Sequence, residues 1–93
     1  MSYKLLFRRE AFSDLQLLRI SRKQDYLKCF DLILAIIKEP RFGIGRPERL
    51  KYTNIKFEIY SRRINEKDRL IYLIDEDHEI IEIISVSGHY NDK

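Results

Sequence analysis

Three strand-like segments in the second half of the chain constrain its fold most. They run from Phe57 to Ile64, Arg69 to Ile74 and Glu79 to Val86, and each is rich in aliphatic or aromatic residues. The connections between them are short, and Asp75-Glu76-Asp77-His78 has the composition of a tight turn. Because short connections join antiparallel neighbours, we expect a largely antiparallel sheet, with His78 exposed to solvent in its turn.

The first forty residues predict one strand followed by two helices. Tyr3 to Phe7 has strand composition, and two apolar stripes with helical spacing follow it. The first stripe consists of Phe12, Leu15 and Leu18, and the second of Tyr26, Phe30, Ile33 and Ile37. Ser21 is the expected N-cap of the second helix because its hydroxyl can accept a free backbone N–H. Pro40 is expected to end that helix, since the residue before a proline is pushed out of the α region.

The element order β-α-α-β-β-β predicts an α+β fold. Two N-terminal helices pack on one face of the small sheet, and the other face stays partly open. A chain of 93 residues is expected to form a single domain spanning residues 1–93. Hydrophobic residues make up 44% and charged residues 35% of the chain, which is typical of a globular protein rather than a disordered one.

Composition also bears on the cellular location. The longest apolar run, Leu32 to Ile37, is far shorter than the roughly 20 residues that span a bilayer, and no secretory leader is recognisable. Cys29 is the only cysteine, so no internal disulfide is expected, and a small apolar filler on a helix is its expected role. These features predict a cytoplasmic protein without membrane contact.

Positive charge is concentrated between Arg41 and Arg69. This window has nine Lys or Arg and four Asp or Glu, a net charge of +5, whereas the rest of the chain has nine basic and eleven acidic residues, a net charge of −2. A basic strip attracts a polyanion such as a nucleic-acid backbone through counterion release. A solvated surface or a docking face for an acidic protein explains the charge equally well.

Residues in and beyond this window have the chemistry needed to cleave RNA. The 2′-hydroxyl of RNA is its own nucleophile, so Glu48 can act as a general base and His89 as a general acid, with no metal or cofactor. Arg69 can stabilise charge on the phosphate, and Tyr90 can stack on a base. The further residues expected to bind RNA or phosphate are Arg49, Lys51, Arg62 and Arg63.

Each of these residues also has a simpler explanation. Glu48 can be a surface carboxylate paired with Arg46 or Arg49, and Arg69 can protect a sheet edge from unwanted pairing. His89-Tyr90 can be a frayed tail. The glycines of Gly43-Ile44-Gly45 are weak evidence for a phosphate cradle, because no complete phosphate-binding motif follows them. A loop that enters a strand is the better interpretation of that segment.

These motifs together resemble the YoeB/Txe group of RelE-superfamily toxins from bacterial toxin–antitoxin systems. The matching stretches are Gly-Ile-Gly-Arg-Pro-Glu-Arg-Leu-Lys (43–51), Ser-Arg-Arg-Ile (61–64), Arg-Leu-Ile-Tyr (69–72) and His89-Tyr90. Each stretch alone is weak, but their joint occurrence is specific. The chain departs from the group in lacking tryptophan, in a longer segment from Asn54 to Tyr60, and in three residues after Tyr90.

The resemblance implies a RelE-like fold and a ribosome-dependent endoribonuclease that cuts mRNA in the decoding A site and so inhibits translation. The family's catalytic residues fall on Glu48, Arg69, His89 and Tyr90, and its other basic residues fall on Lys51 and Arg63. The implied partners are the ribosome, mRNA and a cognate YefM/Axe-like antitoxin, and a homodimer is a further option. The alternatives are a ParE-like toxin without nuclease activity or an inactive toxin, either of which acts only by binding protein.

Overall fold

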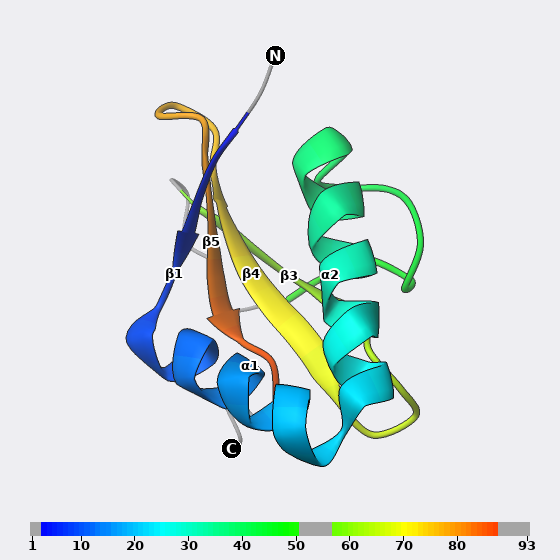
Figure 1. Ribbon diagram of the computed structural model, residues 1–93. Helices are drawn as coiled ribbons and strands as arrows, with labels where there is room; N and C mark the ends of the chain where they lie inside the picture. The colour runs from blue at the N-terminus through cyan, green and yellow to red at the C-terminus, as the bar shows by residue number, and fades with distance from the viewer. Residues whose placement is uncertain (1–2, 51–56, 88–93) are drawn as a thin grey trace.

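The computed structural model describes residues 3–50 and 57–87 (Figure 1). The elements along the chain are β1 (Lys4–Phe7), α1 (Arg9–Ser21), α2 (Lys23–Lys38), β2 (Glu48–Arg49), β3 (Glu58–Arg63), β4 (Arg69–Asp75) and β5 (Ile80–Ser85). The predicted α+β class, the three C-terminal strands and the turn that joins β4 to β5 are confirmed. The short strand β2 is an addition to the predicted order.

The five strands form one sheet in the order β1-β5-β4-β3-β2. The pairs β2–β3, β3–β4 and β4–β5 are antiparallel, and β1 pairs with β5 in parallel. The sheet is therefore largely antiparallel, as predicted, with β4 at its centre. Arg69, the first residue of β4, does not lie at a sheet edge, so edge protection is not its role.

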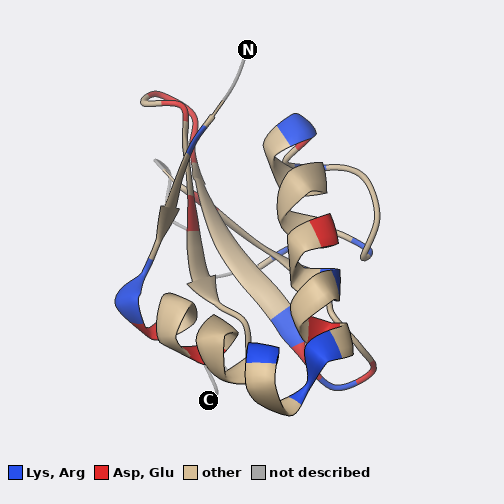
Figure 2. Cartoon of the chain, in the orientation of Figure 1, with Lys and Arg blue, Asp and Glu red and all other residues tan. Residues whose placement is uncertain are grey.

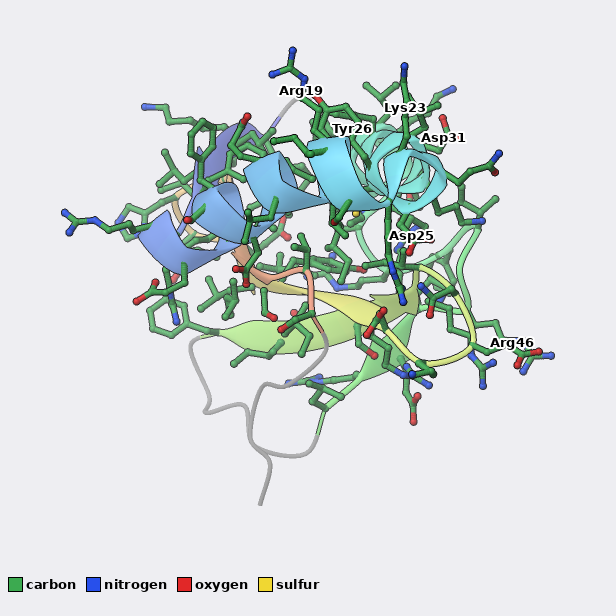
Figure 3. All side chains as sticks on the ribbon, turned by 60° about the horizontal axis from the view of Figure 1, so that its bottom comes forward. Arg19, Lys23, Asp25, Tyr26, Asp31 and Arg46 are labelled. Atoms are coloured by element: carbon green, nitrogen blue, oxygen red, sulfur yellow. The ribbon has the colours of Figure 1, made fainter. Side chains whose placement is uncertain are left out.

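The helices cover one face of the sheet, as Figures 1 and 3 show. Successive residues of a strand point to opposite faces. Leu70, Tyr72 and Ile74 of β4 therefore pack in the main core with both helices, whereas Ile71 belongs to a smaller cluster with Ile59 and Ile84. We call these the helix face and the open face of the sheet.

The prediction of which residues each helix buries against the sheet is partly wrong. In α1 the buried residues are Ala11 and Leu15, and Phe12 is 52% exposed with its ring edge-on to Phe7. In α2 the buried residues are Cys29, Leu32, Ile33 and Ile36, so Ile33 is the one residue of the predicted stripe that is buried. The small side chains of Ala11 and Cys29 allow close packing on the sheet, and the larger Phe12 and Phe30 lie beside the core.

The junction between the helices also differs from the prediction. Ser21 is the last residue of α1, and its hydroxyl donates to the backbone carbonyl of Leu17 at 2.9 Å, so it does not cap α2. Arg22 joins the helices, and its guanidinium contacts Asp25 of α2 at 3.2 Å. The predicted end of α2 is confirmed, because the helix stops at Lys38, two residues before Pro40.

Cys29 is a buried core residue, as predicted. Its side chain is fully enclosed, and burial raises the pKa of its thiol to about 12, with the nearby Asp25 adding to the effect. A thiol of this kind stays protonated at neutral pH and is a poor nucleophile.

Candidate functional site

The short strand β2 brings Glu48 onto the sheet. Glu48 lies opposite Ser61 of β3, and Arg49 lies opposite Tyr60. Two further backbone bonds flank this pairing, from the N–H of Leu50 to the oxygen of Ile59 and from the N–H of Arg63 to the oxygen of Gly45, each at 2.7 Å. Glu48 therefore has a defined register although its strand has only two residues.

The loop before β2 approaches β3 closely at Gly45. This glycine has a φ of +83°, a conformation that side chains disfavour. A Cβ atom added to this residue would lie 2.7 Å from Leu32 Cδ2 and 3.1 Å from Arg62 Cβ. The glycine is thus needed for the loop conformation and for close contact with the core, which supports its interpretation as a loop entering a strand.

Arg62 holds the same loop from inside the protein. Its side chain has no exposed area. Its guanidinium donates to the backbone carbonyls of Glu39 at 2.7 Å, Phe42 at 2.9 Å and Ile44 at 3.1 Å. It also donates through Nε to the hydroxyl of Tyr72 at 3.0 Å, and that hydroxyl donates to the carbonyl of Pro40 at 2.6 Å. Arg62 and Tyr72 therefore fix the path of the chain from α2 towards β2.

The prediction that Arg62 binds RNA is wrong. Arg62 shares the helix face with Tyr60 and Ile64, because residues two apart in a strand point to the same side. Tyr60 and Ile64 both pack in or against the main core. This alternation is a signal in the sequence that identifies Arg62 as an inward-facing residue.

Arg69 and Glu48 meet on the open face, although 21 positions separate them in the sequence. The Nη1 atom of Arg69 lies 3.3 Å from Glu48 Oε1, and it donates to the hydroxyl oxygen of Ser61 at 2.7 Å. The side chain of Arg69 is 33% exposed and that of Glu48 is 63% exposed. The carboxylate and the guanidinium are therefore held together at the surface, where a substrate can reach both.

The partner of Glu48 differs from those that the simpler explanation named. The ion pair joins Glu48 to Arg69, and Figure 3 shows Arg46 pointing away from the sheet. Arg49 neighbours Glu48 in β2, so it points to the other side of that strand, and its charge helps to lower the pKa of Glu58 after the larger effect of Arg41. The register of β2 thus places Arg49 on the opposite side of the strand from the Glu48–Arg69 pair.

Arg63 lies beside the pair. It is exposed at the end of β3, directly opposite Arg69 in the neighbouring strand. Like charges placed opposite each other repel, and an anion above the open face relieves that repulsion. The acidic turn between β4 and β5 lies at the far end of the sheet from this site (Figure 2). Lys51, His89 and Tyr90, the other predicted site residues, lie outside the described part of the chain.

Another arginine in the basic window has a structural role. Arg41 forms a two-pronged ion pair with Glu58, at 3.0 Å from Nε to Oε1 and 2.7 Å from Nη2 to Oε2. Its Nη2 also contacts Glu76 at 3.1 Å, and Tyr3 donates to the same carboxylate. This network ties the loop after α2 to β3 and to the β4–β5 turn, and its charge is neutralised locally.

Two further observations concern binding sites. Within residues 3–50 and 57–87, no group of three or more His, Cys, Asp or Glu is arranged to hold a metal ion, and no helix is long and apolar enough to cross a membrane.

A cleft of about 580 Å³ lies beside α1, where Leu17, Arg22 and Asp68 line it. It is separate from the open-face pair, so the candidate site is an exposed surface and not this cleft.

Comparison with known proteins shows the relationship of the chain. The family model described as YoeB-like toxin of bacterial type II toxin–antitoxin system matches residues 7–90. The chain belongs to this family. Toxin YoeB of Escherichia coli K12 is 33% identical over 78 residues, which cover 84% of this chain and 90% of that relative. Toxin YoeB of Synechocystis is 46% identical over 59 residues, which cover 63% of this chain and 64% of that relative.

Solved structures of YoeB-like toxins have the same fold. A YoeB dimer from Staphylococcus aureus matches with a TM-score of 0.80 and 34% identity, covering 95% of this chain and 98% of that one. A heterotetrameric YoeB–YefM complex from the same organism matches with a TM-score of 0.77 over the same shares. The RelE–RelB complex from Pyrococcus horikoshii, at 20% identity and a TM-score of 0.75, covers 98% of this chain and 99% of that one. It confirms the predicted RelE-like fold.

Proposed function

We propose that this YoeB-like toxin is a ribosome-dependent endoribonuclease that cleaves mRNA in the A site and thereby inhibits translation. The contact between Glu48 and Arg69 on the open face carries the proposal. Glu48 removes the proton of the 2′-hydroxyl, which attacks the neighbouring phosphorus and displaces the 5′-oxygen. Arg69 stabilises the negative charge that gathers on the phosphate oxygens, and the reaction needs no metal.

The remaining predicted residues complete the mechanism. His89 protonates the leaving 5′-oxygen, and Tyr90 orients the RNA by stacking on a base. Arg63 and Lys51 add positive charge along the RNA backbone. The exposure of Arg63 directly opposite Arg69 supports its part in this arrangement.

The proposed partners follow from the relatives. Solved structures of Staphylococcus aureus toxins include a YoeB dimer and YoeB–YefM complexes. We propose that a cognate YefM-like antitoxin neutralises this toxin in the cytoplasm and that the toxin can pair with a second copy of itself. The proposed ribosome dependence rests on membership of the family.

Cleavage of mRNA on programmed ribosomes tests this function. Antitoxin-free protein is added to ribosomes with a defined A-site codon, and the cut positions are mapped by primer extension. Wild type is expected to cut within that codon. Glu48→Gln and His89→Ala are expected to lose about 10²–10⁴-fold in rate while staying folded, since each removes a general acid or base. Glu10→Gln, an exposed carboxylate change in α1, is the matched control.

The alternatives predict a different outcome. A ParE-like or inactive toxin that acts only by binding protein leaves the mRNA intact even when the wild-type chain is folded and free of antitoxin. Unchanged cleavage by folded Glu48→Gln removes Glu48 from the mechanism and leaves the nuclease function in place.

A further inference from the structure

Ser61 has a buried hydroxyl on the open face of the sheet, in β3. Its relative exposure is 1%, and it is paired across the sheet with Glu48 on one side and Ile71 on the other. Ile59, two residues earlier in β3, belongs to the apolar cluster on this face. A hydroxyl placed beside such a cluster needs a polar partner, and Arg69 provides it.

Ser61 and Glu48 share one nitrogen atom of Arg69. The Nη1 atom has two hydrogens, and it lies 2.7 Å from Ser61 Oγ but 3.3 Å from Glu48 Oε1. The shorter contact is to the buried serine, which the sheet holds in place, and the longer one is to the exposed carboxylate. The position of the guanidinium is therefore set mainly by Ser61.

From this geometry we propose that Ser61 is a positioning residue, which keeps Arg69 from forming a tight, two-pronged pair with Glu48. This inference rests on the proposed nuclease function. An arginine and a carboxylate prefer two parallel hydrogen bonds, and such a pair occupies both groups. By holding Nη1, Ser61 keeps the ion pair loose. Glu48 then stays available to take a proton, and the other nitrogens of Arg69 stay available to the phosphate.

Threonine and valine at position 61 separate the hydroxyl from the packing. The two side chains have nearly the same shape, both suit a strand, and threonine alone retains an oxygen that can accept from Arg69. Ser61→Thr is expected to cleave mRNA on programmed ribosomes within about threefold of wild type. Ser61→Val is expected to lose about ten- to a hundredfold, the size of effect seen when a catalytic group is misplaced.

A second comparison excludes a purely structural effect. If Ser61 acts through Arg69, Ser61→Thr and Ser61→Val have the same residual rate in chains that also carry Arg69→Met, because coupled residues are not additive. Thermal unfolding of each variant shows that the proteins compared are folded to the same extent. If the additional methyl group prevents folding in both, Ser61→Ala against wild type makes the same comparison.

The outcomes separate this inference from the proposed function. Equal cleavage by folded Ser61→Thr and Ser61→Val overturns the positioning role while wild-type cleavage stands. A tenfold or larger loss in Ser61→Val that persists with Arg69→Met also overturns it, since the hydroxyl then acts through another group. Absence of cleavage by wild type in the same assay counts against the proposed function itself.

Discussion

Two arginines on opposite faces of the sheet have different roles because their surroundings differ. Arg62 on the helix face is fully buried and donates to three backbone carbonyls and a tyrosine hydroxyl. Arg69 on the open face is 33% exposed, and the hydrogen bonds of its side chain to the described residues both come from a single nitrogen. On the helix face, the arginine donates its hydrogen bonds to groups of the protein itself. The open face leaves much of its guanidinium available to a ligand.

The two faces also depend on each other. Arg62 and Tyr72 fix residues 39–44, and the following turn at Gly45 places β2 against β3. This path brings Glu48 to its position beside Arg69. A residue without any substrate contact thus supports the geometry of the exposed pair.

Loss of Arg62 is expected to have the largest effect on stability. Arg62→Met removes the donor to three part-buried backbone carbonyls and to the buried hydroxyl of Tyr72, so we expect it to lower the free energy of unfolding by about 3 kcal/mol or more. For a domain of this size, the melting temperature then falls by more than about 10 °C. Circular dichroism measures the change. Arg63→Met is the control and is expected to stay within about 1 kcal/mol of wild type. Arg69→Met leaves only the buried Ser61 hydroxyl without its donor, so we expect it to cost about 1–2 kcal/mol, and an equal loss in Arg62→Met and Arg69→Met contradicts the contrast between the faces.

The hydroxyl of Tyr72 tests the same network with a smaller change. Tyr72→Phe leaves Nε of Arg62 and the carbonyl of Pro40 without their partner. We expect it to lower the free energy of unfolding, measured with urea, by about 1–3 kcal/mol. Tyr60→Phe is the matched control. It also removes a tyrosine hydroxyl, from the half-buried ring that stacks on Tyr72 with 5.9 Å between ring centroids. A similar cost for both variants shows that the Arg62 contact has no special importance.

Acid titration gives the smallest expected effect. Arg41 lowers the pKa of Glu58, so the folded state favours the ionised carboxylate. This contribution to stability is present above the pKa that Glu58 has in the unfolded chain, and it is lost as the pH falls through the lowered value. Between pH 7 and about pH 3, Glu58→Gln is therefore expected to lose less stability than wild type, by up to about 1 kcal/mol. Parallel pH curves for the two proteins contradict this.

The sequence predicted the sheet better than the helices or the site geometry. The three C-terminal strands are rich in aliphatic and aromatic residues and are joined by short turns, so their order along the chain could be predicted directly. The helical phase was harder because α2 has apolar residues on two adjacent faces, and the buried one includes the small Cys29. The alternation of Tyr60, Arg62 and Ile64 identifies the inward-facing arginine, but a charged residue within a basic strip suggests RNA binding instead.

Contacts between residues far apart in the chain could not be predicted from the sequence. The meeting of Glu48 with Arg69 depends on the register of a two-residue strand, which backbone contacts of the preceding loop determine. Ser61 was missed as a site residue because a lone serine in a strand has no distinctive pattern. The predicted roles of His89, Tyr90 and Lys51 remain predictions, since these residues lie outside the described part of the chain.

Cleavage by Arg69→Met on programmed ribosomes tests the central claim most directly. The variant is compared with wild type and Arg63→Met after all three are shown to be folded. We expect wild type to cut in the A-site codon and Arg69→Met to lose at least about a hundredfold in rate, because the main charge facing the phosphate is gone. Arg63→Met is expected to lose less. Folded Arg69→Met that cleaves at the wild-type rate contradicts a catalytic centre at the Glu48–Arg69 pair.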